Sequence, residues 1–362
     1  MRRHARVFLL PLVVAASACA GPSPSPSPAA TAPAPAAAWR DLGPAGSLPA
    51  TRDAPALTYD AAGGRVILFA GKGRDYYNDT WAYDGATNAW SNLSPAGPLP
   101  PARFGHAMAY SSATGRVVVF GGALEATGQP AGDTWTLDAA ADVWSQAQPA
   151  GGPPPRLYPA MVDDPATGTE ILFGGWTGSN AFNDTWTFDP RTGVWADRKP
   201  AAAPPARWGA AMVYDPTADR VILFGGLAGS YDGSTRFGDT WAYDAVANTW
   251  TQLQPAGDQP PSRGYATMAW DPAAGRAVLF GGFAGGSVLL GDTWAFDPAA
   301  TTWTHLDPPG VSPAVRDFHA MAYDATDKVT VLFGGLTGMT GNVDGTLLND
   351  TWAFGTALAP GQ

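Results

Sequence analysis

The tripeptide Asp-Thr-Trp occurs six times in this 362-residue chain, at nearly even intervals. A period of about 53 residues is typical of a repeat architecture, in which each unit is one small supersecondary structure. A single unit of this kind cannot bury its own apolar face, so the six units must pack against one another. The tripeptides end at Trp81, Trp135, Trp186, Trp241, Trp294 and Trp352.

Other residues recur around this tripeptide in a fixed order. An apolar run ending in Phe-Gly-Gly precedes each copy, as at residues 221–226, with Ala70-Gly71 as the one variant. An arginine lies upstream of that run. The residues seven positions after the arginines are Tyr59, Tyr110, Asp163, Tyr214, Trp270 and Tyr323. Five units then end in an aspartate followed six positions later by a tryptophan, as Asp84 and Trp90.

Each unit predicts four strands. Strand A runs from the arginine to the aromatic residue, strand B is the apolar run, strand C is Asp-Thr-Trp-x-aromatic, and strand D starts at the last tryptophan. The 44 Gly and 35 Pro supply turns and disfavour helices. We therefore predict an all-β, six-bladed β-propeller, a ring that hides its strand edges by closing on itself.

The order of the pieces predicts how the ring closes. The last unit has Trp352 but lacks a strand D, and Gly355 replaces its aspartate. The first unit is preceded by an unpaired strand D at residues 39–42. We expect this N-terminal strand to complete the sixth blade.

The Gly-Gly doublet, the aromatic residue of strand C and the spaced tryptophan of strand D resemble the kelch-repeat family, whose period is about 50 residues. The resemblance covers residues 39–354 and implies four-stranded kelch-type blades, a fold that the central domain of galactose oxidase shares. The single cysteine, Cys19, lies outside this region, so the Cys-Tyr crosslink of that enzyme has no counterpart here.

One arginine and one Asp-Thr-Trp aspartate per unit suit an internal ion pair better than an active site, which is normally unique. Aspartates such as Asp189, Asp244 and Asp297 are expected to begin C–D turns and to bond the local backbone. The residues assigned this structural pairing are Arg52, Arg103, Arg156, Arg207, Arg263 and Arg316 with Asp79, Asp133, Asp184, Asp239, Asp292 and Asp350.

Residues that fall outside the repeated positions are the candidates for ligand binding. The B–C and D–A connections emerge on one side of the disc, called the loop face here, and the A–B and C–D turns on the other, the turn face. Aromatic residues outside the repeat positions fall on the loop face, where B–C loops vary from 7 to 14 residues. Only Trp176 and Trp208 of the 15 Trp lack a repeat position. The ligand-binding candidates are Trp176, Trp208, Tyr158, Tyr265, Phe104, Tyr231, Tyr76 and Tyr77, although loop aromatics that merely cover the channel mouth fit equally well.

A catalytic alternative uses Asp53, Asp317 and His319. The two aspartates directly follow arginines in blades one and six, which are neighbours in a closed ring, and two carboxylates with an imidazole suit acid/base chemistry. His106 has the same offset as His319, but a shared metal requires both to face the channel. We predict no metal site and no cofactor.

The first residues predict export. Arg2, Arg3 and Arg6 precede an apolar run at 7–14 and a small-residue stretch, which together are typical of a signal peptide over residues 1–18. Ala16-Ser17-Ala18 before Cys19 fits plain cleavage and also resembles the lipobox of bacterial lipoproteins. We expect a lipid anchor at Cys19, a tether over 19–38 rich in Ala, Pro and Ser, the propeller over 39–354 and a tail over 355–362, with simple secretion as the alternative.

Three functions follow as hypotheses. The first is an extracytoplasmic, membrane-anchored kelch-repeat module that binds a protein or carbohydrate ligand on the loop face, acting as a monomer. The second is a sugar isomerase or hydrolase, and the third a structural surface protein. The formal net charge of −10 argues against nucleic-acid partners, because it repels phosphate backbones.

Overall fold

The computed structural model describes residues 36–149, 151–229, 235–338 and 345–356. Within these ranges the secondary structure consists of strands and turns. No helix of the described residues is long and apolar enough to span a membrane. The predictions for Cys19 and Tyr231 concern residues outside these ranges.

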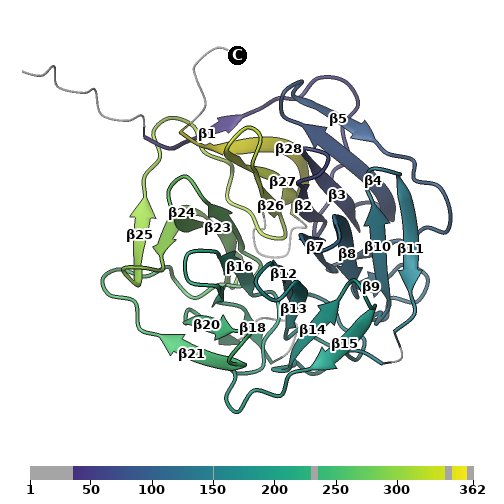
Figure 1. The fold of residues 1–362 in the computed structure, drawn as a ribbon. Coiled ribbons are helices and arrows are strands. Elements are labelled where there is room, and N and C mark those ends of the chain that lie inside the picture. Colours follow the sequence, from purple (N-terminus) through teal and green to yellow (C-terminus); the bar gives the residue numbers. More distant parts are fainter. Residues whose placement is uncertain (1–35, 150, 230–234, 339–344, 357–362) are drawn as a thin grey trace, which may run out of the picture. The chain divides into compact units, whose positions relative to one another are not determined.

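Six four-stranded antiparallel sheets form the blades of a propeller (Figure 1). Their innermost strands, β2, β7, β12, β16, β22 and β26, contact one another in order and then back to β2, so the ring is closed. The sequence prediction of an all-β, six-bladed propeller is confirmed.

The strands of each blade are given in order from the innermost to the outermost. Blades 1 to 3 are β2 (Ala56–Asp60), β3 (Arg65–Lys72), β4 (Tyr76–Asp84), β5 (Ala89–Asn92); β7 (Ala107–Ser111), β8 (Arg116–Phe120), β10 (Thr134–Asp138), β11 (Val143–Ala147); β12 (Ala160–Asp164), β13 (Thr169–Phe173), β14 (Thr185–Asp189), β15 (Val194–Asp197). Blades 4 to 6 are β16 (Ala211–Asp215), β17 (Arg220–Phe224), β20 (Thr240–Asp244), β21 (Thr249–Leu253); β22 (Thr267–Asp271), β23 (Arg276–Gly285), β24 (Val288–Asp297), β25 (Thr302–Leu306); β26 (Ala320–Asp324), β27 (Val329–Thr337), β28 (Thr346–Gly355), β1 (Ala38–Asp41). Two small loop-face sheets pair β6 (Arg103–Phe104) with β9 (Ala123–Leu124) and β18 (Leu227–Ala228) with β19 (Thr235–Arg236).

The N-terminal strand closes the ring as predicted. Strand β1 pairs antiparallel with β28, which places Trp39 opposite Phe354. The Trp39 indole is 3% exposed and contacts the rings of Phe280 and Phe354, with centroids 4.9 and 5.0 Å away. Blade 6 is thus built from both ends of the propeller sequence.

The inner strands begin four residues after each arginine, so the prediction that strand A starts at the arginine was wrong. The cause is the backbone two residues after each arginine, which has φ between 44° and 62° and cannot continue a strand. The arginine and the next residue pair with the adjoining B–C connections instead, as in the bridge between Asp53 and Lys72.

The Gly-Gly doublet permits close approach of these D–A segments. A Cβ on Gly174 would lie 2.4 Å from the Arg207 carbonyl oxygen of the next blade, and one on Gly175 3.1 Å from the Leu157 carbonyl oxygen of its own blade. Both glycines also have positive φ. The doublet therefore suits the point where two D–A segments contact one B–C connection, although in blade 1 Ala70 occupies the first position with a φ of 57°.

Each buried arginine forms a clamp with the aspartate of its unit. In blade 4, Arg207 donates from Nη1 and Nη2 to the two carboxylate oxygens of Asp239 at 2.6 and 2.9 Å, and from Nη1 to the Gly225 carbonyl at 2.9 Å. Trp241 Nε1 donates to the same carboxylate at 2.7 Å. Although burial raises the pKa of Asp239, the hydrogen bonds and charge of Arg207 outweigh it and hold the pKa below its usual value. The other five blades repeat this bidentate pair.

The clamp also joins neighbouring blades. The Arg207 amide donates to the Phe182 carbonyl at 2.9 Å, and the Gly175 amide donates to the Arg207 carbonyl at 2.9 Å, both in blade 3. Its side chain is bonded within blade 4. The backbone of each arginine thus bonds to the preceding blade, and its guanidinium bonds within its own blade.

The outer strands add a second bond between blades. The strand D tryptophan donates from Nε1 to the threonine of Asp-Thr-Trp in the preceding blade, as Trp250 does to Thr185 at 2.9 Å. Trp39 of β1 makes the same bond to Thr293 at 2.9 Å. The remaining pairs are Trp90–Thr351, Trp144–Thr80, Trp195–Thr134 and Trp303–Thr240.

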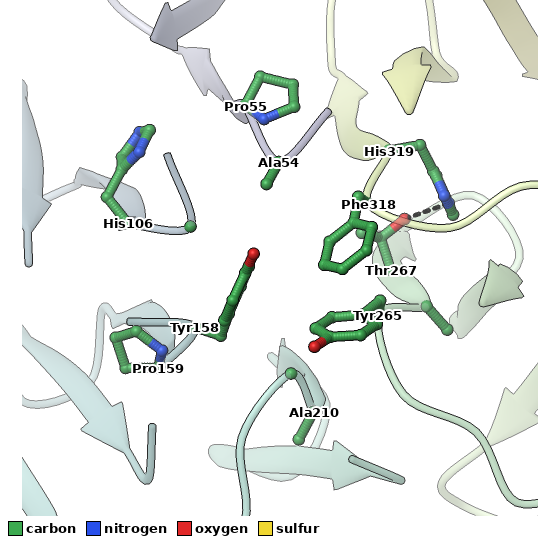
Figure 2. A pocket seen from close by; sticks show the side chains of 13 residues that line it. Ala54, Pro55, His106, Tyr158, Pro159, Ala210, Tyr265, Thr267, Phe318 and His319 are labelled. Atoms are coloured by element: carbon green, nitrogen blue, oxygen red, sulfur yellow. Dashed lines mark hydrogen bonds between the residues drawn. The ribbon is translucent and has the colours of Figure 1, made fainter. Parts of the chain in front are cut away.

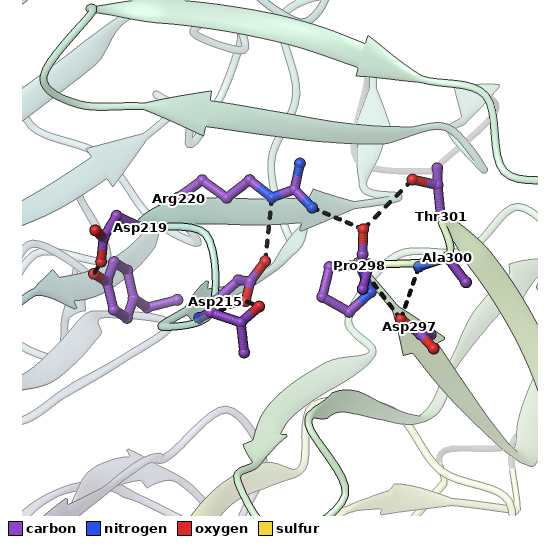
Figure 3. A network of polar contacts seen from close by, with 10 residues as sticks. Asp215, Asp219, Arg220, Asp297, Pro298, Ala300 and Thr301 are labelled. Atoms are coloured by element: carbon purple, nitrogen blue, oxygen red, sulfur yellow. Dashed lines mark hydrogen bonds and ion pairs between the residues drawn. The ribbon is translucent and has the colours of Figure 1, made fainter.

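The turn face is held by local carboxylate bonds (Figure 3). Asp297 accepts from the amides of Ala299 and Ala300 at 2.9 and 3.0 Å, which fixes a C–D turn. Arg220 of blade 4 donates to Asp215 at 3.1 Å and to the Pro298 carbonyl of blade 5 at 2.8 Å. Asp189 and Asp244 similarly accept from the amides of Arg191 and Ala247.

Candidate functional site

Six residues surround the propeller axis on the loop face, each two positions after a clamp arginine. All have positive φ, which is unusual for bulky side chains and costs about 1–3 kcal/mol at each non-glycine position. Five amide-to-carbonyl bonds of 2.6 to 3.1 Å link them around the axis. We call this ring the axial belt; its members are Ala54, Gly105, Tyr158, Gly209, Tyr265 and Phe318.

Three aromatic side chains of the axial belt gather over the channel (Figure 2). The ring centroid of Tyr265 lies 3.8 Å from that of Phe318 and 5.2 Å from that of Tyr158. Beside them is a cavity of about 110 Å³, also lined by His106, Thr267 and His319. The sequence identified Tyr158 and Tyr265 as candidates, and the structure places both at the axis.

Trp176 and Trp208 are stacked on each other, with ring centroids 5.0 Å apart and planes 14° apart. Trp208 is 1% exposed and also contacts Tyr158 and Tyr265, whereas Trp176 is only partly buried. The two indoles are therefore not exposed together, because the rings of Trp176, Tyr158 and Tyr265 pack around Trp208. We call the cluster over blades 3 to 6 the aromatic sector; it comprises Tyr158, Trp176, Trp208, Tyr265, Phe283 and Phe318.

Of the blade 1 and 2 candidates, Tyr76 and Phe104 contact each other at 5.0 Å in an edge-to-face arrangement. The Lys72 ammonium lies over both rings, 5.4 Å from the Phe104 centroid and 5.7 Å from that of Tyr76. The Phe104 ring reaches Tyr158 at 6.0 Å, so this group adjoins the aromatic sector.

Tyr77 has a different environment, because its ring stacks on the buried Arg52 guanidinium at 4.2 Å. Phe182 and Phe237 cover Arg156 and Arg207 in the same way at 3.9 Å. All three stand two residues before a clamp aspartate. That shared offset was a signal in the sequence that they belong to the scaffold.

Asp53 and Asp317 are neighbours across the seam between blades 1 and 6, where the Ala54 amide donates to the Phe318 carbonyl at 2.8 Å. Burial, partly offset by the charge of Lys72, raises the pKa of Asp53 to about 6. Burial together with repulsion from Asp53 raises the pKa of Asp317 to about 8. We call this pair the acidic seam.

His319 does not complete a trio with these aspartates. Its Nε2 is 2.8 Å from the Thr267 hydroxyl of blade 5, and its ring packs on Phe280. His106 lies on the other side of the pocket, against Phe69 (Figure 2). Burial lowers the pKa of both imidazoles to about 3, so they are neutral at physiological pH. Over the described residues, no three His, Cys, Asp or Glu side chains are grouped to hold a metal ion.

A second carboxyl pair lies toward the turn face. Asp163 and Glu170 are directly opposite each other on β12 and β13. Burial raises the pKa of Asp163 to about 6, and burial with the charge of Asp163 raises the pKa of Glu170 well above its usual value. The sequence marked Asp163 as the one non-aromatic residue at its repeat position, but strand register was needed to find its partner.

Comparisons with known proteins agree with this architecture. The sequence model of the KLHDC2/KLHL20/DRC7 kelch-repeats domain matches residues 35–202 and 166–358. The chain is 29% identical over 323 residues to Adagio-like protein 1 of Oryza sativa subsp. japonica, covering 83% of this chain and 50% of that protein. It is 29% identical over 297 residues to Adagio protein 3 of Arabidopsis thaliana, covering 77% and 46%.

The chain thus spans about half the length of these curated relatives. The two matched ranges together cover residues 35–358, which span all six blades of the ring. On these grounds the chain belongs to the kelch-repeat family of β-propellers.

Proposed function

We propose that this propeller is a protein-binding module whose ligand docks on the loop face. A kelch-repeat propeller suits that role because a rigid ring carries loops of differing length and chemistry. The observation that carries the proposal is that aromatic and acidic side chains occupy different parts of the loop face. Partly buried aromatic residues occupy one side, and the acidic seam occupies blades 1 and 6. Such a face combines an apolar anchor surface with acidic groups, and protein recognition uses both kinds of group.

The size of the axial cavity favours docking on the face over enclosure of a small molecule. It measures about 110 Å³ and adjoins a second cavity of about 180 Å³ between the inner strands, and each is smaller than the usual small-molecule site of about 300–1,000 Å³. A sugar-processing enzyme using Asp53, Asp317 and His319 is less well supported, because His319 bonds Thr267. A carbohydrate ligand remains the alternative, with the outer face of Trp176 as the stacking surface.

Replacing Trp176 with alanine is expected to weaken the protein complex at least about tenfold, because buried aromatic anchors carry much of the energy of an interface. Proteins captured by the full chain are identified, purified and titrated against the variant. The matched control is Val246→Ser, which removes an apolar side chain that is 80% exposed on the turn face. Equal losses in both variants would refute docking on the loop face. Loss of glycan-array binding without any protein complex would favour the carbohydrate alternative.

We also propose that the chain is exported and lipid-anchored at Cys19, which the residues before Cys19 support. Mass spectrometry of the protein purified from its native host is expected to show a lipid-modified Cys19 as the first residue. The Cys19→Ser variant should be recovered unanchored. An unmodified Cys19 within a longer mature chain would contradict the anchor.

A further inference from the structure

The acidic seam breaks the pattern of the other four blades. The residue directly after the clamp arginine is aspartate only in blades 1 and 6, and the equivalent residues elsewhere are Phe104, Leu157, Trp208 and Gly264. Asp53 and Asp317 exchange backbone bonds with Lys72 and Leu336 at the bases of the B–C hairpins of these two blades. Rigid backbone therefore holds the two carboxyl groups on either side of one seam.

The seam has unmet hydrogen-bonding capacity. Asp317 is 1% exposed, and its Oδ1 lacks a hydrogen-bond partner among the described residues, as does Oδ1 of Asp53. A buried carboxylate oxygen left without a donor is costly. No ion pair within the described part of the chain involves either aspartate, and the Lys72 ammonium lies over the rings of Tyr76 and Phe104 instead.

The charge of the pair depends on pH near neutrality. With pKa values of about 6 for Asp53 and about 8 for Asp317, the seam holds close to one negative charge at pH 7. The two aspartates lie on adjoining segments, because the Ala54 amide, one residue after Asp53, donates to the carbonyl of Phe318, one residue after Asp317, at 2.8 Å. A cation placed between them would supply the missing donors and favour ionisation of the second carboxyl.

We propose that the acidic seam receives the guanidinium group of an arginine side chain presented by the protein ligand. This inference rests on the proposed function, since it names the chemistry of the ligand on the same face. A guanidinium has five donors in a planar fork, which matches two carboxylates better than the point charge of an ammonium.

The test uses the full chain and two blocked tripeptides that differ only in charge, Gly-Arg-Gly and Gly-citrulline-Gly. Binding is measured by calorimetry from pH 6 to about pH 9.5. We expect the arginine peptide to bind, and its affinity to rise by up to about tenfold per pH unit until it levels off above pH 8, because binding requires the ionised Asp317. Binding at pH 7 should release close to one proton. The citrulline peptide should not bind.

Two variants localise the effect. Asp317→Asn should abolish binding of the arginine peptide, and Asp53→Asn should weaken it at least about tenfold, as expected when one carboxylate of a charge-assisted pair is removed. The control is Asp163→Asn, which removes another carboxyl of raised pKa on the opposite side of the disc and should leave binding unchanged. Circular dichroism establishes that each variant is folded.

The possible failures are distinguishable. Equal affinity for the two peptides, a pH-independent affinity, or the same loss in Asp163→Asn would overturn the seam proposal. So would calcium displacing the arginine peptide, which would make the seam a metal site. A protein complex that depends on Trp176 but not on Asp317 would refute this inference and leave the proposed function intact. Binding of the arginine peptide without any protein complex on the loop face would refute the proposed function alone.

Discussion

A chain that begins at Pro44 is expected to be less stable than the full propeller by more than about 5 kcal/mol. The deletion removes β1, which exposes the edge of β28, and it removes Trp39, whose indole is buried against Phe280 and Phe354 and bonded to Thr293. Loss of a buried tryptophan side chain alone costs about 3–5 kcal/mol. The unfolding free energy is measured by urea denaturation, with thermal unfolding as a second measure.

The control is a chain that begins at Ala36, which retains β1 and should match the full chain. A synthetic peptide of residues 36–43 should raise the melting temperature of the shortened protein, because it can pair with β28 in place of β1. The same peptide with Trp39 replaced by alanine should not. If the chain beginning at Pro44 melts no earlier than the one beginning at Ala36, strand β1 does not lock the ring.

The Arg207→Ala substitution is expected to lower the unfolding free energy by about 3–5 kcal/mol, the usual cost of breaking a buried ion pair by removing one partner. The guanidinium is fully buried, and it bonds Asp239 and two carbonyl groups that would lose their donor. Its removal also leaves Trp241 bonded to a carboxylate that lacks its countercharge.

Arg116→Ala is the matched control for this clamp. Arg116 pairs with Asp138 at 3.7 Å, and both side chains are exposed, so its removal should cost less than about 1 kcal/mol. Urea denaturation of both variants and of Asp239→Asn gives the comparison. Similar losses for Arg207→Ala and Arg116→Ala would show that the clamps are not structural.

The fold was predictable because its contacts fall on repeated positions. The clamp, the Gly-Gly doublet and the strand D tryptophan each use one residue per unit, so their spacing revealed the blades before any contact was known. The start of strand A was not predictable in this way. It depends on the positive φ of the axial belt, where Tyr158 and Phe318 adopt a backbone conformation that their residue types do not favour.

The candidate site was predictable only in part. Closure of the ring makes blades 1 and 6 neighbours, which was enough to bring Asp53 and Asp317 together. The burial of Trp208 was not predictable, because it is set by side chains from two other blades, Tyr158 and Trp176 of blade 3 and Tyr265 of blade 5. Loop residues of this kind are positioned by tertiary contacts that local sequence does not encode.

The pairing of β1 with β28 also sets an order of events during synthesis. Trp39 is made early, yet its strand partner Phe354 and its hydrogen-bond partner Thr293 emerge only after most of the propeller has been made. Until then β1 is an unpaired, partly apolar strand, and the open ring presents two unsatisfied blade faces. Bringing together segments so distant in sequence is slow. The nascent chain therefore remains open to wrong strand pairing until its last blade is complete.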